Sequence, residues 1–329
     1  EEEKEVELQG KSEPLEVTSG VKSYCGVDDV TITSSASRQY AVAVSGGGKL
    51  AFHMKSGKLL VENTHSWNSL SQIQYDGVAA IRAAGAGSSG SFEGTGIFKA
   101  TGGGKNVGVS AIVSSEGADL TLSGNITGEA MAKLNDNSGY QAYGAAAVEK
   151  GRLTFQGEQT TLSACTATGQ GSSGVFVHQD GTVSFESKNV TVSAQSDDSI
   201  GTGINASEGT VSTSPETSLT VIAGGKAGGT GIELLRNGHI NIEGDADIRV
   251  TGVNTTGIKN SEGKIETKKN LKIRVSEGDS TASLYGVYSS YSGAKTQLKG
   301  DVDLAVTSSG AADGVYAYYG GEVILGTAG

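Results

Sequence analysis

A glycine followed by valine or isoleucine recurs along this chain at intervals of 26 to 36 residues. Self-similarity with a period of about 20–50 residues is typical of repeat proteins, in which each repeat is one structural unit stacked on its neighbours. The repeated glycines are Gly77, Gly108, Gly144 (followed here by alanine), Gly174, Gly203, Gly231, Gly257, Gly286 and Gly314. An earlier, imperfect copy starts at Tyr40, so a repeat architecture is predicted from about Tyr40 onwards.

Each repeat contains three short segments with the alternating apolar and polar pattern of β-strands. One complete example is given by residues 174–177, 181–185 and 189–192. The chain has 51 glycines and only 2 prolines among its 329 residues. So much glycine disfavours helix, and scarce proline suits strands that have a hydrogen-bonded neighbour on both sides.

These features predict an all-β fold, a parallel β-helix (solenoid) with about ten coils of three short strands. Each strand would pair in parallel with its copy in the next coil, with apolar side chains inward and polar ones outward. Glycine at the corners would supply positive φ or room for a sharp bend. The alternatives are a β-sandwich and a propeller, but a propeller blade needs about 40–50 residues, more than these repeats contain.

Three parts of the chain depart from the regular repeat. Residues 1–39 are predicted to form an irregular N-terminal coil or cap, and residues 40–329 the β-helix itself. Within the β-helix, His53 to Gln74 has no counterpart in the other repeats and is predicted to be a loop excursion between coils. Glu129 to Tyr143 is predicted to lengthen another coil.

Charge, hydropathy and cysteine content argue against nucleic-acid binding, membrane insertion and a disulfide bond. The net charge of −11 disfavours nucleic-acid binding, because phosphate recognition needs clustered Lys and Arg. No apolar run reaches the ~18–20 residues of a membrane span, so we expect no membrane insertion of this chain. Cys25 and Cys165 should lie several coils apart, and two free thiols are therefore predicted.

From Tyr40 to Gly329 the chain resembles the passenger region of bacterial autotransporters, the type V secreted proteins. The resemblance is carried by Gly-(Val/Ile) coils in a chain that is rich in Gly, Ser, Thr and Asn, acidic, and poor in Cys. It implies a right-handed β-helix that is part of a longer protein, is exported through a C-terminal outer-membrane barrel and is displayed on a Gram-negative cell. Common roles in that family are adhesion, self-association and biofilm formation.

Motifs for cofactors and catalysis are weak. Two strings match Gly-x-Gly-x-x-Gly, at 85–90 and 169–174, but no helix is predicted after either, as a dinucleotide site requires. The four histidines lie in different repeats: His53, His65, His178 and His239. We therefore predict no catalytic residues, no cofactor-binding residues and no metal ligands.

A carboxylate cluster would be the signature of a glycan-processing β-helix enzyme. Aligning the third strands predicts one outward column. Its members are Thr191, Thr220, Arg249, Lys272 and Asp303. Two Asp-x-Asp pairs, at 245–247 and 301–303, are separated in this alignment by Asn270 and Lys272. The column has mixed charge, and the carboxylate cluster is interrupted.

The candidate binding surface is aromatic. Tyr288 and Tyr316, and likewise Tyr291 and Tyr319, are 28 residues apart and should stack on adjacent coils. Together with Tyr318 they could form an exposed surface for a sugar or a protein, since tyrosine combines an apolar ring with a polar tip. The alternative is that the stacked rings reinforce the solenoid or border a further coil.

The sequence thus favours a cell-surface adhesin that acts through the side of a β-helical rod. Its partner would be a surface protein or glycan of a host or bacterial cell, with self-association of the rods as one form of binding. The alternatives are a glycan-processing β-helix enzyme and a passive stalk for a distal binding domain.

Overall fold

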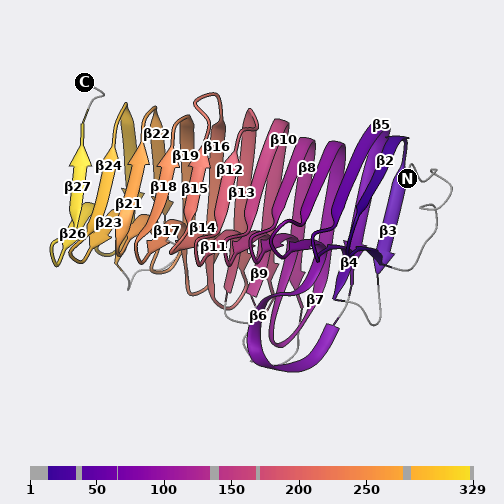
Figure 1. Cartoon of the computed structure of the whole chain (residues 1–329). Helices are drawn as coiled ribbons and strands as arrows, with labels where there is room; N and C mark the ends of the chain where they lie inside the picture. Colours follow the sequence, from indigo (N-terminus) through magenta and orange to yellow (C-terminus); the bar gives the residue numbers. More distant parts are fainter. Residues whose placement is uncertain are drawn as a thin grey trace.

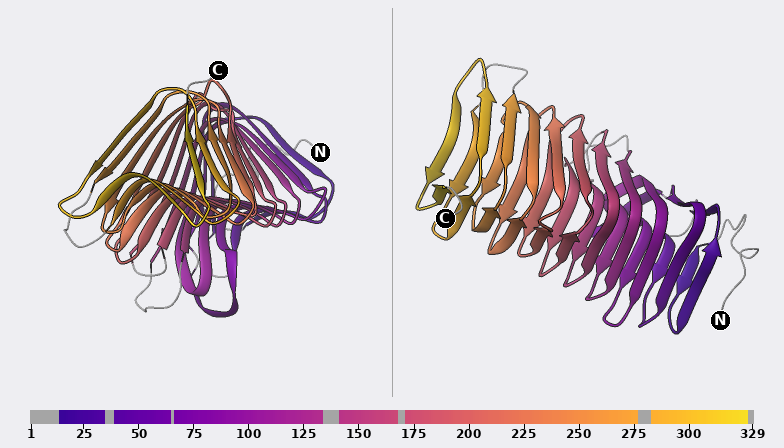
Figure 2. Two further views of the ribbon diagram at one scale, coloured as in Figure 1. Left: turned by 90° about the vertical axis from the view of Figure 1, so that its left-hand side faces the viewer. Right: turned by 90° about the horizontal axis from the view of Figure 1, so that it is seen from above.

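A computed structural model of the chain describes residues 14–34, 39–64, 66–133, 141–167, 171–276 and 283–326. All regular elements in these residues are β-strands. They stack in chain order into one rod, with the first coil at one end and β26 and β27 at the other (Figure 1). The same order is seen from above in Figure 2.

Each coil has three strand positions, which we call first, second and third. The first strands are β1 (Leu15–Val17), β4 (Tyr40–Val44), the end of β6 (Ser66–Ala84), the end of β7 (Ser89–Ser115), β9 (Gln141–Val148), β11 (Gly171–His178), β14 (Ile200–Ser207), β17 (Gly228–Leu235), β20 (Thr256–Asn260), β23 (Leu284–Ser290) and β26 (Ala312–Tyr318). The second strands are β2 (Val21–Val27), the starts of β5 (Lys49–Asn63), β7, β8 (Asp119–Ala132) and β10 (Arg152–Thr166), then β12 (Thr182–Phe185), β15 (Thr210–Thr213), β18 (Gly238–Ile242), β21 (Gly263–Thr267), β24 (Ala294–Leu298) and β27 (Glu322–Leu325). The third strands are β3 (Val30–Ser34), later parts of β5, β7, β8 and β10, then β13 (Asn189–Ser196), β16 (Ser218–Gly225), β19 (Asp245–Gly252), β22 (Leu271–Ser276) and β25 (Val302–Thr307).

Every strand position pairs in parallel with the same position in the next coil. On the first strands, for example, Val175 pairs with Ile204 and Ile204 pairs with Ile232. On the third strands, Val221 pairs with Ile248 and Ile248 with Ile273. The prediction of an all-β parallel β-helix is confirmed.

The core consists of apolar columns that run along the rod. Val221, Ile248 and Ile273 are each 0% exposed, and apolar side chains fill most of the other buried positions, with polar ones such as Thr213 and Thr267 among them. Burying one such side chain stabilises the fold by about 1.5–3 kcal/mol. Rings stack inside the rod as well, as those of Phe155 and Phe185 do at a centroid distance of 5.4 Å. The core is therefore continuous from coil to coil.

The repeated glycines are required for space. A Cβ on Gly231 would lie 2.3 Å from Ile248 Cγ2 and 2.5 Å from the carbonyl oxygen of Gly257 in the next coil. A Cβ on Gly203 would likewise lie 2.2 Å from Val221 Cγ1. None of the repeated glycines has the positive φ that favours glycine. The inward side chain of the third strand thus occupies the volume that any larger residue would need.

The corners only partly follow the prediction of glycine at positive φ. Gly124 and Gly157, between second and third strands, have φ of 113° and 99° as expected. Between first and second strands, however, the left-handed residues are mostly not glycine, as at Glu149, Gln179 and Arg236 with φ of 51°, 50° and 50°. Backbone hydrogen bonds between coils hold these corners, for example from Glu149 N to His178 O (3.2 Å).

Residues 15–34 are more regular than predicted. Instead of an irregular cap, β1, β2 and β3 form a coil whose strands pair in parallel with β4 and β5, as Ile32 does with Val61. The remaining parts of 1–39, at 1–13 and 35–38, lie outside the described residues. The strands were missed because this coil lacks the Gly-(Val/Ile) signature.

The prediction that His53 to Gln74 form a loop is wrong for the first half of that segment. Residues 58–63 form a third strand, in which Leu59 and Val61 are buried. From Ser66, β6 pairs with β7, and the two extend away from the side of the rod (Figure 1). Of the predicted extension from Glu129 to Tyr143, residues 129–132 belong to β8 and 141–143 to β9, whereas 134–140 lie outside the described residues.

Cys25 and Cys165 are both free thiols, as predicted. Cys25 lies on β2 of the first described coil, and Cys165 lies on β10. Burial is the main cause that raises the pKa of the Cys165 thiol, so this side chain is a weak nucleophile at neutral pH.

We expect Gly231→Ala to lower the melting temperature by several degrees, because overpacking a core typically costs about 1–3 kcal/mol. Gly314→Ala is the matched control. It changes the equivalent glycine of the last described coil, where the nearest heavy atom, Leu304 Cδ2, would lie 3.5 Å from the new Cβ. Circular dichroism melts compare the two variants, and equal melting temperatures would contradict the steric explanation.

Candidate functional site

Six tyrosines lie together on the last two described coils, and we call them the tyrosine surface. They are Tyr285, Tyr288, Tyr291, Tyr316, Tyr318 and Tyr319. Tyr288 on β23 pairs in register with Tyr316 on β26. Tyr291 and Tyr319 occupy the equivalent corners that follow these two strands, with φ of 73° and 48°. The predicted stacking of each pair across coils is confirmed.

The rings are nearly parallel within each pair. The Tyr288 and Tyr316 centroids are 5.6 Å apart with planes inclined by 15°, and those of Tyr291 and Tyr319 are 6.2 Å apart and inclined by 4°. Tyr318 meets Tyr319 edge to face at 4.1 Å. Contacts of this kind contribute about 0.5–1.5 kcal/mol each beyond area burial, so the cluster stabilises itself.

The exposure of the rings determines what the tyrosine surface can offer to a partner. Tyr291, Tyr318 and Tyr319 are 53%, 42% and 68% exposed, whereas Tyr288 and Tyr316 are half-buried. A hydrogen bond with Tyr319 is the main cause that raises the pKa of Tyr318, so this hydroxyl is protonated at neutral pH. The surface therefore offers aromatic rings and hydroxyl groups to a partner.

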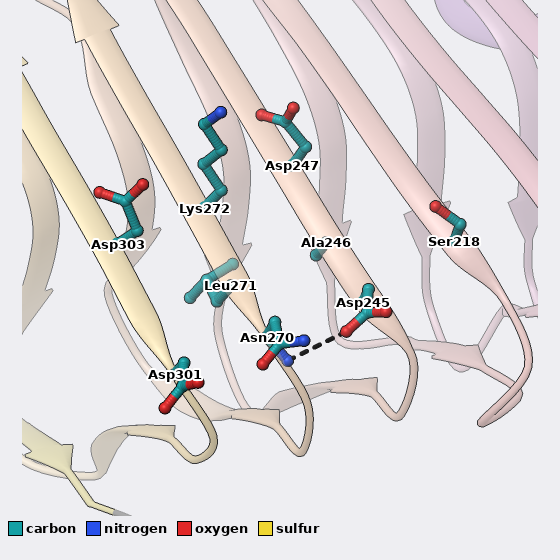
Figure 3. Close-up of a pocket in the computed structure, with 9 residues that line it drawn as sticks. All are labelled: Ser218, Asp245, Ala246, Asp247, Asn270, Leu271, Lys272, Asp301 and Asp303. Carbon is teal, nitrogen blue, oxygen red and sulfur yellow. Dashed lines mark hydrogen bonds between the residues drawn. The ribbon is translucent and has the colours of Figure 1, made fainter.

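A second candidate, which we call the charged groove, lies on the third strands of a different face (Figure 3). It has a volume of about 380 Å³. Its charged and amide side chains come from β19, β22 and β25 and the residues just before them. They are Asp245, Asp247, Asn270, Lys272, Asp301 and Asp303.

The register corrects the predicted outward column at one position. Asp247, not Arg249, stands between Thr220 and Lys272, and Lys272 pairs with Asp303 as predicted. Arg249 lies two residues further along β19, where it pairs with Arg274. The two Asp-x-Asp pairs do flank Asn270 and Lys272, as predicted, so Lys272 has an aspartate on both sides in its column.

Arginines neutralise two of the groove's carboxylates. Arg249 Nη2 donates to Asp247 Oδ2 at 2.6 Å, and Arg274 donates to Asp303. The hydrogen bond from Arg274 is the main cause that lowers the pKa of Asp303 below its usual value. Asp303 is therefore ionised at neutral pH, which suits charge recognition and does not suit a general acid.

The histidines remain apart. His53 contacts Glu93 at 3.0 Å, His178 contacts the carbonyl oxygen of Ser207 at 3.2 Å, and His239 lies on β18. His65 lies outside the described residues. In the part of the chain that the structure describes, no group of three or more His, Cys, Asp or Glu side chains could hold a metal ion.

As far as the structure describes them, the two Gly-x-Gly-x-x-Gly strings belong to turns and strands of the coils. Residues 85–90 form the turn before β7 and its first two residues, and no helix follows. Residues 171–174 of the second motif lie in β11, whereas 169 and 170 lie outside the described residues.

No family model matches this chain, and the searches of curated proteins and of solved structures found no match either. Among the described residues there is also no helix with the length and apolar character needed to cross a membrane.

Arg274→Gln should raise the pKa of Asp303 towards its ordinary value, because it removes the donor that stabilises the carboxylate. The carboxyl carbon of Asp303 can be followed by NMR during a pH titration. Lys272→Gln is the control. Its charge is the weaker of the two lowering influences, so this variant should move the titration less. A larger effect from Lys272→Gln would contradict the assignment of the ion pair.

Proposed function

We propose that this chain is the displayed part of a bacterial surface adhesin, which binds its partner through the side of the β-helical rod. The observation that carries the proposal is the tyrosine surface. Tyrosine is among the residues that dominate binding energy at protein interfaces, because it buries a large ring and still offers a hydroxyl group. Tyr291 and Tyr319 place such rings at an exposed corner of two successive coils.

The architecture supports the same proposal. A stiff rod with its side chains in regular columns presents outward groups at intervals of about 4.8 Å, one from each coil. One column of the third strands contains Thr161, Thr191 and Thr220 in successive coils. Such columns suit many weak polar contacts with a cell-surface protein or glycan, or with a second rod. Display on a Gram-negative cell after export through the outer membrane is part of this proposal.

A second candidate function, glycan processing, is favoured by the charged groove, where four aspartates from the two coils on either side of β22 line one depression. Incubation with a panel of polysaccharides separates the two functions. Release of shorter products supports an enzyme, whereas saturable binding without product release supports an adhesin. A chain that neither binds nor cleaves would fit a passive stalk.

The double variant Tyr291→Ser/Tyr319→Ser should reduce binding to bacterial or epithelial cells at least tenfold, because these are the most exposed rings of the cluster. Binding of beads coated with the chain can be counted by flow cytometry. The control is His239→Ser/Lys264→Ser, which changes two residues paired across adjacent coils on the second strands. Equal loss in both double variants would contradict a specific role for the tyrosine surface.

A further inference from the structure

We propose that a pocket on the first strands, distinct from the tyrosine surface and the charged groove, binds a single neutral pyranose sugar. The pocket has a volume of about 180 Å³. The side chains that carry the argument come from β9, β11, β14 and β17. They are Gln141, Ser173, Ile200, Thr202, Asn205 and Glu233.

Glycines on both sides of Ile200 open the pocket. On β17 the register partner of Ile200 is Gly228, and on β11 Gly171 lies so close that a Cβ would be 2.7 Å from the Ile200 carbonyl oxygen. Neither of these two glycines has a side chain that could cover Ile200. This isoleucine is 44% exposed, which makes it one of the few exposed large apolar residues on the described part of the rod. It forms an apolar wall next to polar groups.

Two hydroxyl groups and one amide oxygen of the pocket lack protein partners. Ser173 and Thr202 pair in register and are only 7% and 5% exposed. Neither side chain makes a hydrogen bond among the described residues. Asn205 Oδ1 is buried and accepts no hydrogen bond there. Leaving the buried Asn205 Oδ1 without a donor is unfavourable, so a ligand hydroxyl that donates to this oxygen would be stabilised. The Ser173 and Thr202 hydroxyls can bond to the same ligand.

The charges around the pocket favour a neutral ligand. Glu233 is the one titratable residue in its lining, and Lys259 Nζ lies 2.8 Å from Glu233 Oε1. The carboxylate is thus neutralised by its own partner in the adjacent coil. A ligand with a carboxylate would meet Glu233 at close range, and a ligand with an ammonium group would have to compete with Lys259 for that carboxylate.

The size and chemistry of the pocket fit one sugar ring. A volume of 180 Å³ is that of about six water molecules in the liquid, which suits one sugar ring with its hydroxyl groups. A pyranose carries hydroxyls at its edges and C–H groups on its face. The edges match Ser173, Thr202 and Asn205, and the C–H face matches Ile200. A terminal sugar of a longer glycan could enter with the rest of the chain outside.

The outward column of the first strands changes from apolar to polar at the pocket. Towards the N-terminus, the outward column of the first strands is apolar and buried, at Val113, Ala146 and Phe176. Towards the C-terminus, the same column continues as Asn205, Glu233 and Lys259. The pocket lies where the buried outer column ends, so its opening faces an accessible polar surface.

Methyl NMR of the full chain tests the proposal. The Ile200 methyl signal, assigned with Ile200→Val, is followed during titration with the methyl glycosides of glucose, galactose, mannose and N-acetylglucosamine. We expect a saturable shift with at least one of them and none with methyl galacturonate. Absence of a shift with all four neutral sugars would overturn the proposal, and so would equal binding of the galacturonate.

Thr202→Val removes one hydroxyl while keeping the β-branched shape, and it should weaken binding at least tenfold. Thr230→Val is the matched control, because Thr230 is the register partner of Thr202, is 8% exposed and lies outside the pocket lining. If Thr202→Val does not fold, Asn205→Ala replaces it. Equal losses in the Thr202 or Asn205 variant and in the control would place the sugar elsewhere. The tyrosine variants should leave sugar binding unchanged. The sugar site and the proposed adhesin surface can therefore be tested, and contradicted, independently of each other.

Discussion

The close approach of first and third strands inside each coil is the constraint on which the structure depends. It leaves no room for a Cβ at Gly203, Gly231, Gly257 or Gly286, because the inward side chain of the third strand and the next coil's carbonyl group already occupy that space. A glycine there lets the two sheets close on an apolar core with no gap between them. Since each glycine stacks on the next, one departure would disturb two coils. The spacing of these glycines is therefore a direct record of the coil length.

Register along the rod is fixed by several weak interactions that agree with each other. Apolar columns, backbone hydrogen bonds at the corners and ion pairs between adjacent coils all select the same neighbours. Lys188–Glu158 at 2.6 Å and Lys259–Glu233 at 2.8 Å are examples of such pairs. Exposed pairs contribute little energy individually, but a shift of one residue would break all of them and turn the apolar side chains outward. Because the apolar columns and the backbone hydrogen bonds do not depend on which side chains point outward, the outward columns can vary in sequence.

Features set by a residue's distance from its repeated glycine could be predicted from the sequence. Features set by the exact register between coils could not. The fold and the tyrosine pairs could be predicted, since Tyr288 and Tyr316 stand at equal distances from their glycines. The column containing Asp247 was misplaced by two residues, because alternation also fits the frame with Arg249 and the small inward Ala246 gives a weak apolar signal. The pocket beside Ile200 was missed, because it arises from glycines one coil before and one coil after it. Aligning glycines between coils, rather than reading each repeat alone, could have found it.

The pocket and the tyrosine surface lie on the same face of the rod, at positions set by the coil step. From β14 to β23 there are three steps, which is ~14 Å along the axis at about 4.8 Å per strand. The rigid core does not allow the two sites to approach each other, so only a partner long enough to span this distance can occupy both. Once such a partner is bound at one site, its binding to the second site is intramolecular. The gain in overall affinity then depends on how well the length of the partner matches the distance between the sites. Under the two proposals made above, a short glycan gains nothing from the tyrosines, and only a branched or polymeric one is long enough to reach both sites. The number of coils between two weak sites is thus itself a determinant of specificity, and it follows from the same glycine spacing that builds the fold.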